Sequence, residues 1–270
     1  MLFRSEEFGG GKVLLLNAGV FDDLAVAVMV HPGPVDIAAA RSLTLSAVRV
    51  EYRGREAHAS AAPYLGVNAA DAVTVAQVAI GVLRQQLAPG QQVHGIVSDG
   101  GQVANVIPSR TELQYTMRAT EASSLAELEA KVGDCFLAGA VATGCDYSVE
   151  PTEPMYDALK PDRWLAGAVR GEMTRLGRAP VDEELEAAHP LGSTDMGNVT
   201  QLLPGIHPMV AVDAGGASLH QPDFAAAAIG PSADKAVIDG AIMLARTVVR
   251  LAESPDERDR VLAAREERRL

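Results

Sequence analysis

The chain has 270 residues, 48% of them apolar, and this length allows a sizeable core and two domains. Its formal net charge of −12 argues against a general surface for nucleic acid or anionic membrane. No signal peptide is visible, and no apolar run approaches the roughly 20 residues of a membrane span. Cys135 and Cys145 match no zinc motif and suggest a reducing compartment, so a cytoplasmic protein is expected.

Two adjacent carboxylates, Glu6 and Glu7, stand near the start of the chain and lead into three glycines and Lys12. Adjacent side chains diverge, so one carboxylate can bind a metal ion while the other transfers protons. Glycines let the backbone pass close to a bound group. A solvated acidic turn is the alternative interpretation, and the pair alone does not decide between the two.

Residues 43–155 have a self-contained pattern of strands and helices. Strands are predicted at 43–53, 92–98, 112–119 and 146–150, and helices from Asn68 to about Leu87 and from Leu125 to near Gly144. The order β-α-β-β-α-β is typical of a ferredoxin-like sandwich with helices on one sheet face. The open face or edge of such a sheet needs a cover, which dimerisation commonly supplies.

The flanking residues have the pattern of an α/β layer that residues 43–155 interrupt. The predicted elements are a buried strand at 26–30, an amphipathic helix at 161–176 with Trp164, Val169 and Met173 toward the core, a strand at 209–212 and a helix at 231–252. Residues 253–270 are highly charged and are expected to form a frayed helix or tail. Clefts between domains are favoured ligand sites, so the interruption itself suggests a site.

Several polar residues lie where they can face a cleft. His31 follows an apolar strand, and His220 lies in a loop after a glycine pair; with Glu7 they offer the ligand types that zinc or manganese prefers. Each histidine alone can equally be a hydrogen-bonded structural residue. Asp195, in a loop of small residues, is either part of a simple turn or a substrate contact.

The tracts EEFGGGK, VHPGP, GREAHASAAPYLGVNAADAV, GGQVANVIPSR, GSTDMGNV and LHQPDF follow one another over about 225 residues. Together they resemble the dinuclear-metal amidohydrolase and aminoacylase family, peptidase family M20, which includes N-acyl-amino-acid amidohydrolases, aminobenzoyl-glutamate hydrolases and certain dipeptidases. GSTDMGNV and IHP look closest to the branch with dipeptidases acting on basic C-terminal residues. The resemblance implies an α/β fold, in which a partial metallopeptidase-type α/β catalytic domain (residues 1–42 and 156–252) is interrupted by a ferredoxin-like α+β lid and dimerisation domain (residues 43–155).

The resemblance also implies a role for each matched residue. Glu6 would be the general base, and two divalent metal ions would be bound, zinc foremost with manganese or cobalt as alternatives. Glu7 and His220 would ligate one ion and His31 the other. His58 would reach across a homodimer to polarise the scissile carbonyl, and Asn105 would hold substrate there.

Other polar residues keep more than one interpretation. Arg118 can bind a substrate carboxylate or be a solvated strand residue. His94 and His207 are expected to be structural, and His189 has no assigned role.

The family places further metal ligands, in a His-x-Asp or Cys-x-His motif, upstream of the glutamate pair, and no such motif precedes Glu6. The chain is therefore expected to lack roughly the first third of a full family member. The leading hypothesis is a metal-dependent amidohydrolase acting on an N-acyl amino acid or dipeptide, inactive alone if ligands are missing. The alternatives are a non-catalytic dimerising remnant and half of a split enzyme.

Overall fold

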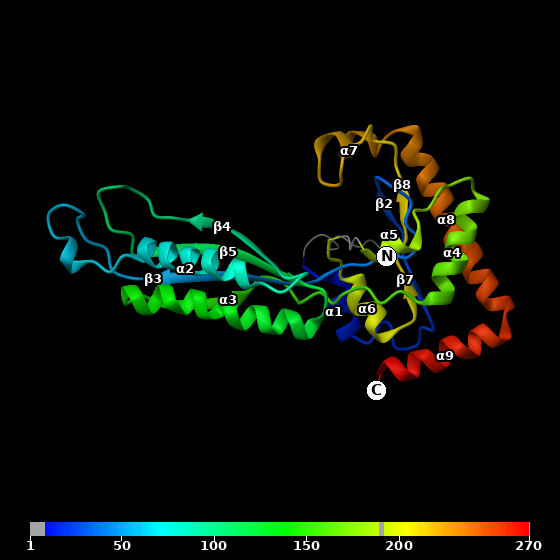
Figure 1. The fold of residues 1–270 in the computed structure, drawn as a ribbon, viewed down its shortest axis with the longest axis horizontal. Coiled ribbons are helices and arrows are strands. Elements are labelled where there is room, and N and C mark those ends of the chain that lie inside the picture. The colour runs from blue at the N-terminus through cyan, green and yellow to red at the C-terminus, as the bar shows by residue number, and fades with distance from the viewer. Residues whose placement is uncertain (1–8, 189–191, 270) are drawn as a thin grey trace. The chain divides into compact units, whose positions relative to one another are not determined.

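Two units, each with its own buried core, make up the residues that the computed structural model describes, 9–188 and 192–269 (Figure 1). Unit 1 contains residues 43–156 together with Gly9 and Gly10, and unit 2 contains residues 11–42 and 157–269. Glu6, Glu7 and His189, which the sequence analysis discusses, lie outside the described residues.

Unit 1 is a four-stranded antiparallel sheet with two helices. Its elements in chain order are β3 (Thr44–Arg53), α2 (Ala69–Leu83), β4 (Gln92–Asp99), β5 (Arg110–Ala119), α3 (Ala122–Thr143) and β6 (Asp146–Pro151). The strands lie in the order β4-β5-β3-β6, and α2 and α3 pack side by side (Figure 1). This topology confirms the ferredoxin-like prediction.

Local sequence sets the helix boundaries of unit 1. The Asn68 side chain accepts a hydrogen bond from the amide of Ala70 and so caps α2. Gly144 ends α3 with a φ of 74°, a conformation that glycine adopts at little cost. The helices bury apolar side chains against one face of the sheet, among them Ile80, Leu125, Leu128, Val132 and Phe136 from the helices and Val50, Tyr52, Leu113, Tyr115 and Met117 from the strands.

Unit 2 joins two distant stretches of the chain through parallel strand pairs. Its elements are α1 (Gly11–Asn17), β1 (Ala27–Val28), β2 (His31–Gly33), α4 (Arg163–Arg175), α5 (Glu183–Ala188), α6 (Met196–Leu202), β7 (Gly205–Ile206), β8 (Met209–Ala211), α7 (Pro222–Ala227), α8 (Pro231–Glu253) and α9 (Pro255–Arg269). β1 pairs with β7 and β2 with β8. α4 and α8 pack against each other and against these strands (Figure 1). Among the described residues, none of the helices has the length and apolarity that crossing a bilayer requires.

The structure differs from the predicted elements at two places in unit 2. The strand expected at 26–30 is half-buried and is split into β1 and β2, because the opposite stretch contains Pro208, which has no amide hydrogen for the ladder. The charged segment expected to fray forms α9. Arg260 of α9 donates to both carboxylate oxygens of Asp162 at 3.0 Å, and Val261 is buried.

The close approach of α3 to α2 generates a stability prediction. A Cβ added at Gly139 would collide with the carbonyl oxygen of Ala72 and lie 3.0 Å from the hydroxyl of Tyr52. We expect Gly139→Ala to lower the free energy of unfolding of unit 1 by about 1–3 kcal/mol.

Gly133→Ala, in the same helix, is the matched control. No described atom lies within 4 Å of the Cβ it would add, so it should raise stability by roughly 0.5–1 kcal/mol. Urea unfolding followed by circular dichroism reports both units, whereas fluorescence of Trp164, the single tryptophan, follows unit 2. A Gly139→Ala protein as stable as wild type would show that the helices can separate freely.

Candidate metal and active site

His31 begins β2 and is half-buried. Its Nδ1 lies 2.6 Å from the carbonyl oxygen of Pro32. A carbonyl oxygen only accepts hydrogen bonds, so Nδ1 carries the proton and the lone pair is on Nε2. Metal-binding histidines are commonly oriented in this way, with one nitrogen donating to a carbonyl and the other facing the ion. The orientation of His31 therefore fits the metal role that the sequence implies.

His207 lies beside His31. It occupies the gap between β7 and β8, and the parallel register places Met209, two residues later, opposite His31. The two imidazole ring centres are 5.8 Å apart with planes inclined by 61°. His207 is buried, and neither ring nitrogen has a hydrogen-bond partner among the described residues. Burial, followed by electrostatic interactions with His31 and Lys12, lowers the pKa of His207 to about 3.

A buried ion pair joins the start of α1 to the small-residue loop before α6. Lys12 Nζ lies 2.5 Å from Oδ1 of Asp195, and the Lys12 amide donates to Oδ2 at 2.9 Å. Only 5% of the Lys12 side chain and 1% of the Asp195 side chain are exposed. The substrate contact predicted for Asp195 stays a prediction; in the structure its carboxylate holds Lys12, whose charge acts on His207.

His220 precedes α7 and is exposed. Among the described residues it is the one non-glycine with a positive φ, at 64°. Such conformations cluster at functional sites, and histidine adopts this one more readily than most residues. The neighbouring Leu219 packs against the cluster that contains Met209, the strand partner of His31. Residues 9–188 and 192–269 contain no group of three or more His, Cys, Asp or Glu side chains arranged to hold a metal ion.

His58 and Asn105 lie together in unit 1, on loops beyond the end of the sheet where Arg53 pairs with Arg110. The backbone bridges His58 to Val106, and the Ala59 amide donates to the Asn105 carbonyl at 3.0 Å. Nδ1 of His58 accepts hydrogen bonds from the amides of Ser60 and Ala61 at 3.3 and 3.2 Å. The neutral ring therefore carries its proton on Nε2, where it can be donated to a ligand.

Arg118 lies at the opposite end of β5 from Arg110 and is half-buried, and burial lowers its pKa. Arg118 lies eight positions after Arg110 along the strand, which corresponds to roughly 26 Å. Unit 1 thus brings Asn105 to His58 but keeps Arg118 away from both.

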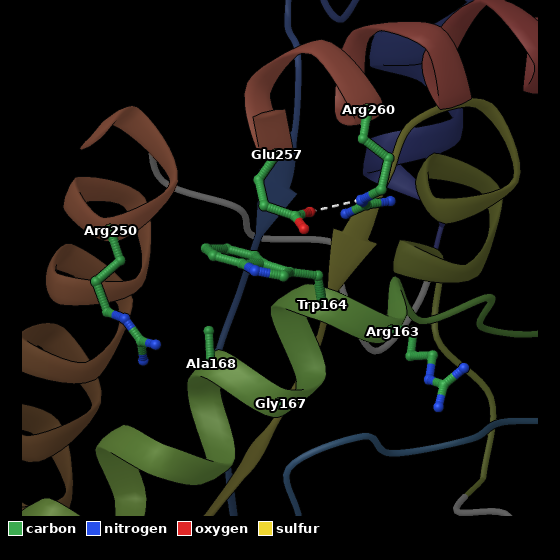
Figure 2. A pocket seen from close by; sticks show the side chains of 7 residues that line it. All are labelled: Arg163, Trp164, Gly167, Ala168, Arg250, Glu257 and Arg260. Atoms are coloured by element: carbon green, nitrogen blue, oxygen red, sulfur yellow. Dashed lines mark hydrogen bonds and ion pairs between the residues drawn. The ribbon is translucent and has the colours of Figure 1, made fainter. Parts of the chain in front are cut away.

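A separate cavity of about 520 Å³ lies among α4, α8 and α9 (Figure 2). It is lined by Arg163, Trp164, Gly167, Ala168, Arg250, Glu257 and Arg260. Arg260 is bonded to Asp162 and Glu257, and Arg250 is paired with Glu172, so these charges anchor the helices to one another. None of the residues predicted for catalysis lines this cavity.

Sequence reasoning missed two residues of the unit 2 site, Lys12 and His207. Lys12 stands directly after the glycine tract, and His207 interrupts an apolar stretch next to a proline. Those local signals could have marked both residues for inspection. Their partners, Asp195 and His31, lie more than 170 residues away in sequence and emerge only from the fold.

Comparisons with known proteins identify relatives over most of the chain. Residues 44–142 match the family model of the M20 peptidase dimerisation domain. The Xaa-Arg dipeptidase of Mus musculus is 42% identical over 204 residues, which are 76% of this chain and 47% of that protein. One of the subunits of the p-aminobenzoyl-glutamate hydrolase of Escherichia coli is 29% identical over 73% of this chain and 41% of its own length. The chain spans about half the length of the curated relatives it matches.

Solved structures share the fold at lower sequence identity. The aminobenzoyl-glutamate utilization protein of Klebsiella pneumoniae superposes with a TM-score of 0.62 at 17% identity, covering 86% of this chain and 56% of that one. An amidase of the hydantoinase/carbamoylase family from Burkholderia vietnamiensis gives 0.61 at 18% identity, covering 82% and 54%.

The buried ion pair generates a second prediction. Asp195→Asn leaves the Lys12 ammonium buried without its counter-charge, and we expect a loss of roughly 3–5 kcal/mol in the unfolding free energy of unit 2. The matched control is Glu183→Gln, which removes an exposed carboxylate 3.6 Å from Arg170 in the same unit and should cost at most about 1 kcal/mol. Trp164 fluorescence in urea measures both, and equal small losses would mean that Lys12 reaches solvent.

Proposed function

Because the chain belongs to the M20 family of peptidases and amidohydrolases, we propose that it carries part of the active site of a metal-dependent enzyme that hydrolyses an amide bond. The proposed substrate is a dipeptide or an N-acyl amino acid. The orientation of His31, whose Nδ1 is held by the Pro32 carbonyl and whose Nε2 keeps its lone pair, is the observation that carries this proposal. The named activities of the dipeptidase and hydrolase relatives support the substrate class.

Unit 2 would provide the metal-binding half of the site. His31 would hold one divalent ion, and Glu7 with His220 would hold the other, with zinc the first candidate and manganese or cobalt the alternatives. When bound, such ions supply charge that stabilises a developing oxyanion and lowers the pKa of water. Glu6 would take the proton of the attacking water and pass it to the leaving amine. Lys12 directly follows the glycine tract, and its ion pair with Asp195 holds this end of the tract in place.

Unit 1 would provide the donor that recognises the scissile carbonyl. The Nε2–H of His58 faces away from its own backbone contacts, because Nδ1 is occupied by the Ser60 and Ala61 amides. A fixed donor of this kind strengthens its hydrogen bond as the carbonyl oxygen becomes negative. Asn105, on the adjacent loop, would hold the substrate, and Arg118 would bind a carboxylate elsewhere on the sheet.

We expect the active form to be a homodimer that uses β4 as its contact edge. β4 and β6 are the two edge strands of the sheet. Both strands expose apolar side chains, Tyr147 and Val149 on β6 and Ile96 and Val97 on β4. β6 also carries Asp146, Glu150 and Pro151, which discourage strand addition, whereas β4 contains no proline. The match to a peptidase dimerisation domain supports this arrangement.

A non-catalytic role by dimerisation is the second candidate. Unit 1 has a complete sheet and its own buried core, so it can serve as an assembly module without a metal centre. Half of a split enzyme, completed by another chain, is the third possibility. Hydrolysis of dipeptides and N-acyl amino acids by the purified chain with its metal content measured, alone and with a candidate partner chain, distinguishes the three.

Glu6 and His58 generate a complementation prediction. In an active preparation, Glu6→Gln should lower kcat by about 10²–10⁴-fold while metal content is kept, since only the base is lost. His58→Ala should also inactivate. An equimolar mixture of the two variants should recover about a quarter of wild-type activity, because half of the dimers formed are mixed and each of these has one intact site out of two. Recovery no greater than that of either variant alone would place His58 outside a shared site.

The edge strand generates a prediction about assembly. Ile96→Lys introduces a charge on β4 and should convert the dimer to a monomer in sedimentation velocity. Val149→Lys, on the other edge strand β6, is the matched control and should leave the dimer intact. Dissociation by the Val149 variant alone would assign the contact to β6.

A further inference from the structure

His207 has an environment that a structural histidine does not explain. Its side chain is buried, with 5% of the residue exposed, yet both ring nitrogens lack a hydrogen-bond partner among the described residues. Burying polar atoms without partners is unfavourable, so nearly all such groups in proteins are satisfied by protein, water or an ion. The imidazole of His207 therefore has two nitrogens that a water molecule or a metal ion can satisfy.

The strand pairing of unit 2 turns this imidazole toward His31. His207 and Met209 are two residues apart, which places them on the same side of an extended chain, and Met209 is the register partner of His31. The ring centres lie 5.8 Å apart. Two imidazoles bonded to one tetrahedral zinc at about 2.0–2.1 Å would have ring centres roughly 5–6 Å apart. The observed separation falls within this range, so the two rings are close enough to bind a single ion.

We propose that His207 supplies a second imidazole to the divalent ion bound by His31. This inference rests on the proposed function, which assigns His31 to a metal. It adds a protein ligand that the motifs did not mark, and it makes the β7–β8 gap part of the metal site. The site takes a borderline cation such as zinc, which imidazole nitrogens suit.

A metal ligand needs a free lone pair, which a neutral imidazole can offer to a cation. Neither ring nitrogen of His207 is engaged by a protein group among the described residues, so the protein leaves both of them open to a ligand.

Zinc affinity of the whole chain tests the inference. Competition with a chromophoric chelator would give the zinc dissociation constant of the wild-type chain and of His31→Ala, His207→Ala and His94→Ala. His94 lies on β4 of unit 1 and is exposed, so its variant is the matched control and should bind as wild type does. The His31 and His207 variants should each bind at least about tenfold more weakly.

The pattern of results separates this inference from the proposed function. No zinc binding by the wild-type chain, or an unchanged affinity in His31→Ala, would overturn both. Weaker binding in His31→Ala with unchanged affinity in His207→Ala would overturn the role of His207 alone.

A measurement on the unaltered chain covers the case in which His207→Ala does not fold. With ¹⁵N-labelled histidine, nuclear magnetic resonance resolves the imidazole nitrogens, and one nitrogen of His207 should shift when zinc is added in equimolar amount. His207 nitrogens that keep their positions while those of His31 shift would overturn the inference.

Discussion

The parallel pairing between residues 27–33 and 205–211 is the constraint on which unit 2 depends. It joins two pieces of chain that the whole of unit 1 separates in sequence. Asp36 reinforces it, since its Oδ1 accepts hydrogen bonds from the Ala211 amide at 2.8 Å and from Arg178 at 3.0 Å. Arg178 in turn donates to Asp239 of α8 at 2.8 Å. The strands are short, and these charge-assisted bonds tie them to the long helix behind them.

The same pairing brings polar residues of the candidate site together. It places His31 beside His207, and the Lys12–Asp195 pair brings the segment after the glycine tract to the same neighbourhood. Buried charge is costly, and here it is offset by a direct ion pair and a backbone hydrogen bond to the same carboxylate. Polar groups are thereby concentrated around the imidazoles of His31 and His207. Among the described residues, the hydrogen bond between His31 Nδ1 and the Pro32 carbonyl is the one that these two rings make.

Unit 1 positions its polar residues through contacts within the unit. Its two helices and inward-facing strand residues form a buried core of their own, and its motif loops carry His58 and Asn105 beyond the end of the sheet. The amides of Ser60 and Ala61, on the same loop as His58, set the orientation of the His58 ring locally. The exposed Nε2–H of His58 is therefore suited to donate a hydrogen bond to a ligand held by another protein surface.

The family, the α/β class and the topology of unit 1 can all be predicted from the sequence, because they rest on local signals: the alternation of residues 43–53, the Asn68 cap, the Gly144 stop and the ordered motifs. The sequence also predicts roles for His31 and His58, which stand in recognisable tracts. Four features emerge only in the folded chain: the break between β1 and β2, the packing of α9, the partner of Asp195 and the position of His207. Each of these features depends on groups distant in sequence, such as Pro208 opposite residues 29–30 and Asp162 beside Arg260. A local sequence pattern does not contain the information about which distant group a side chain contacts after folding.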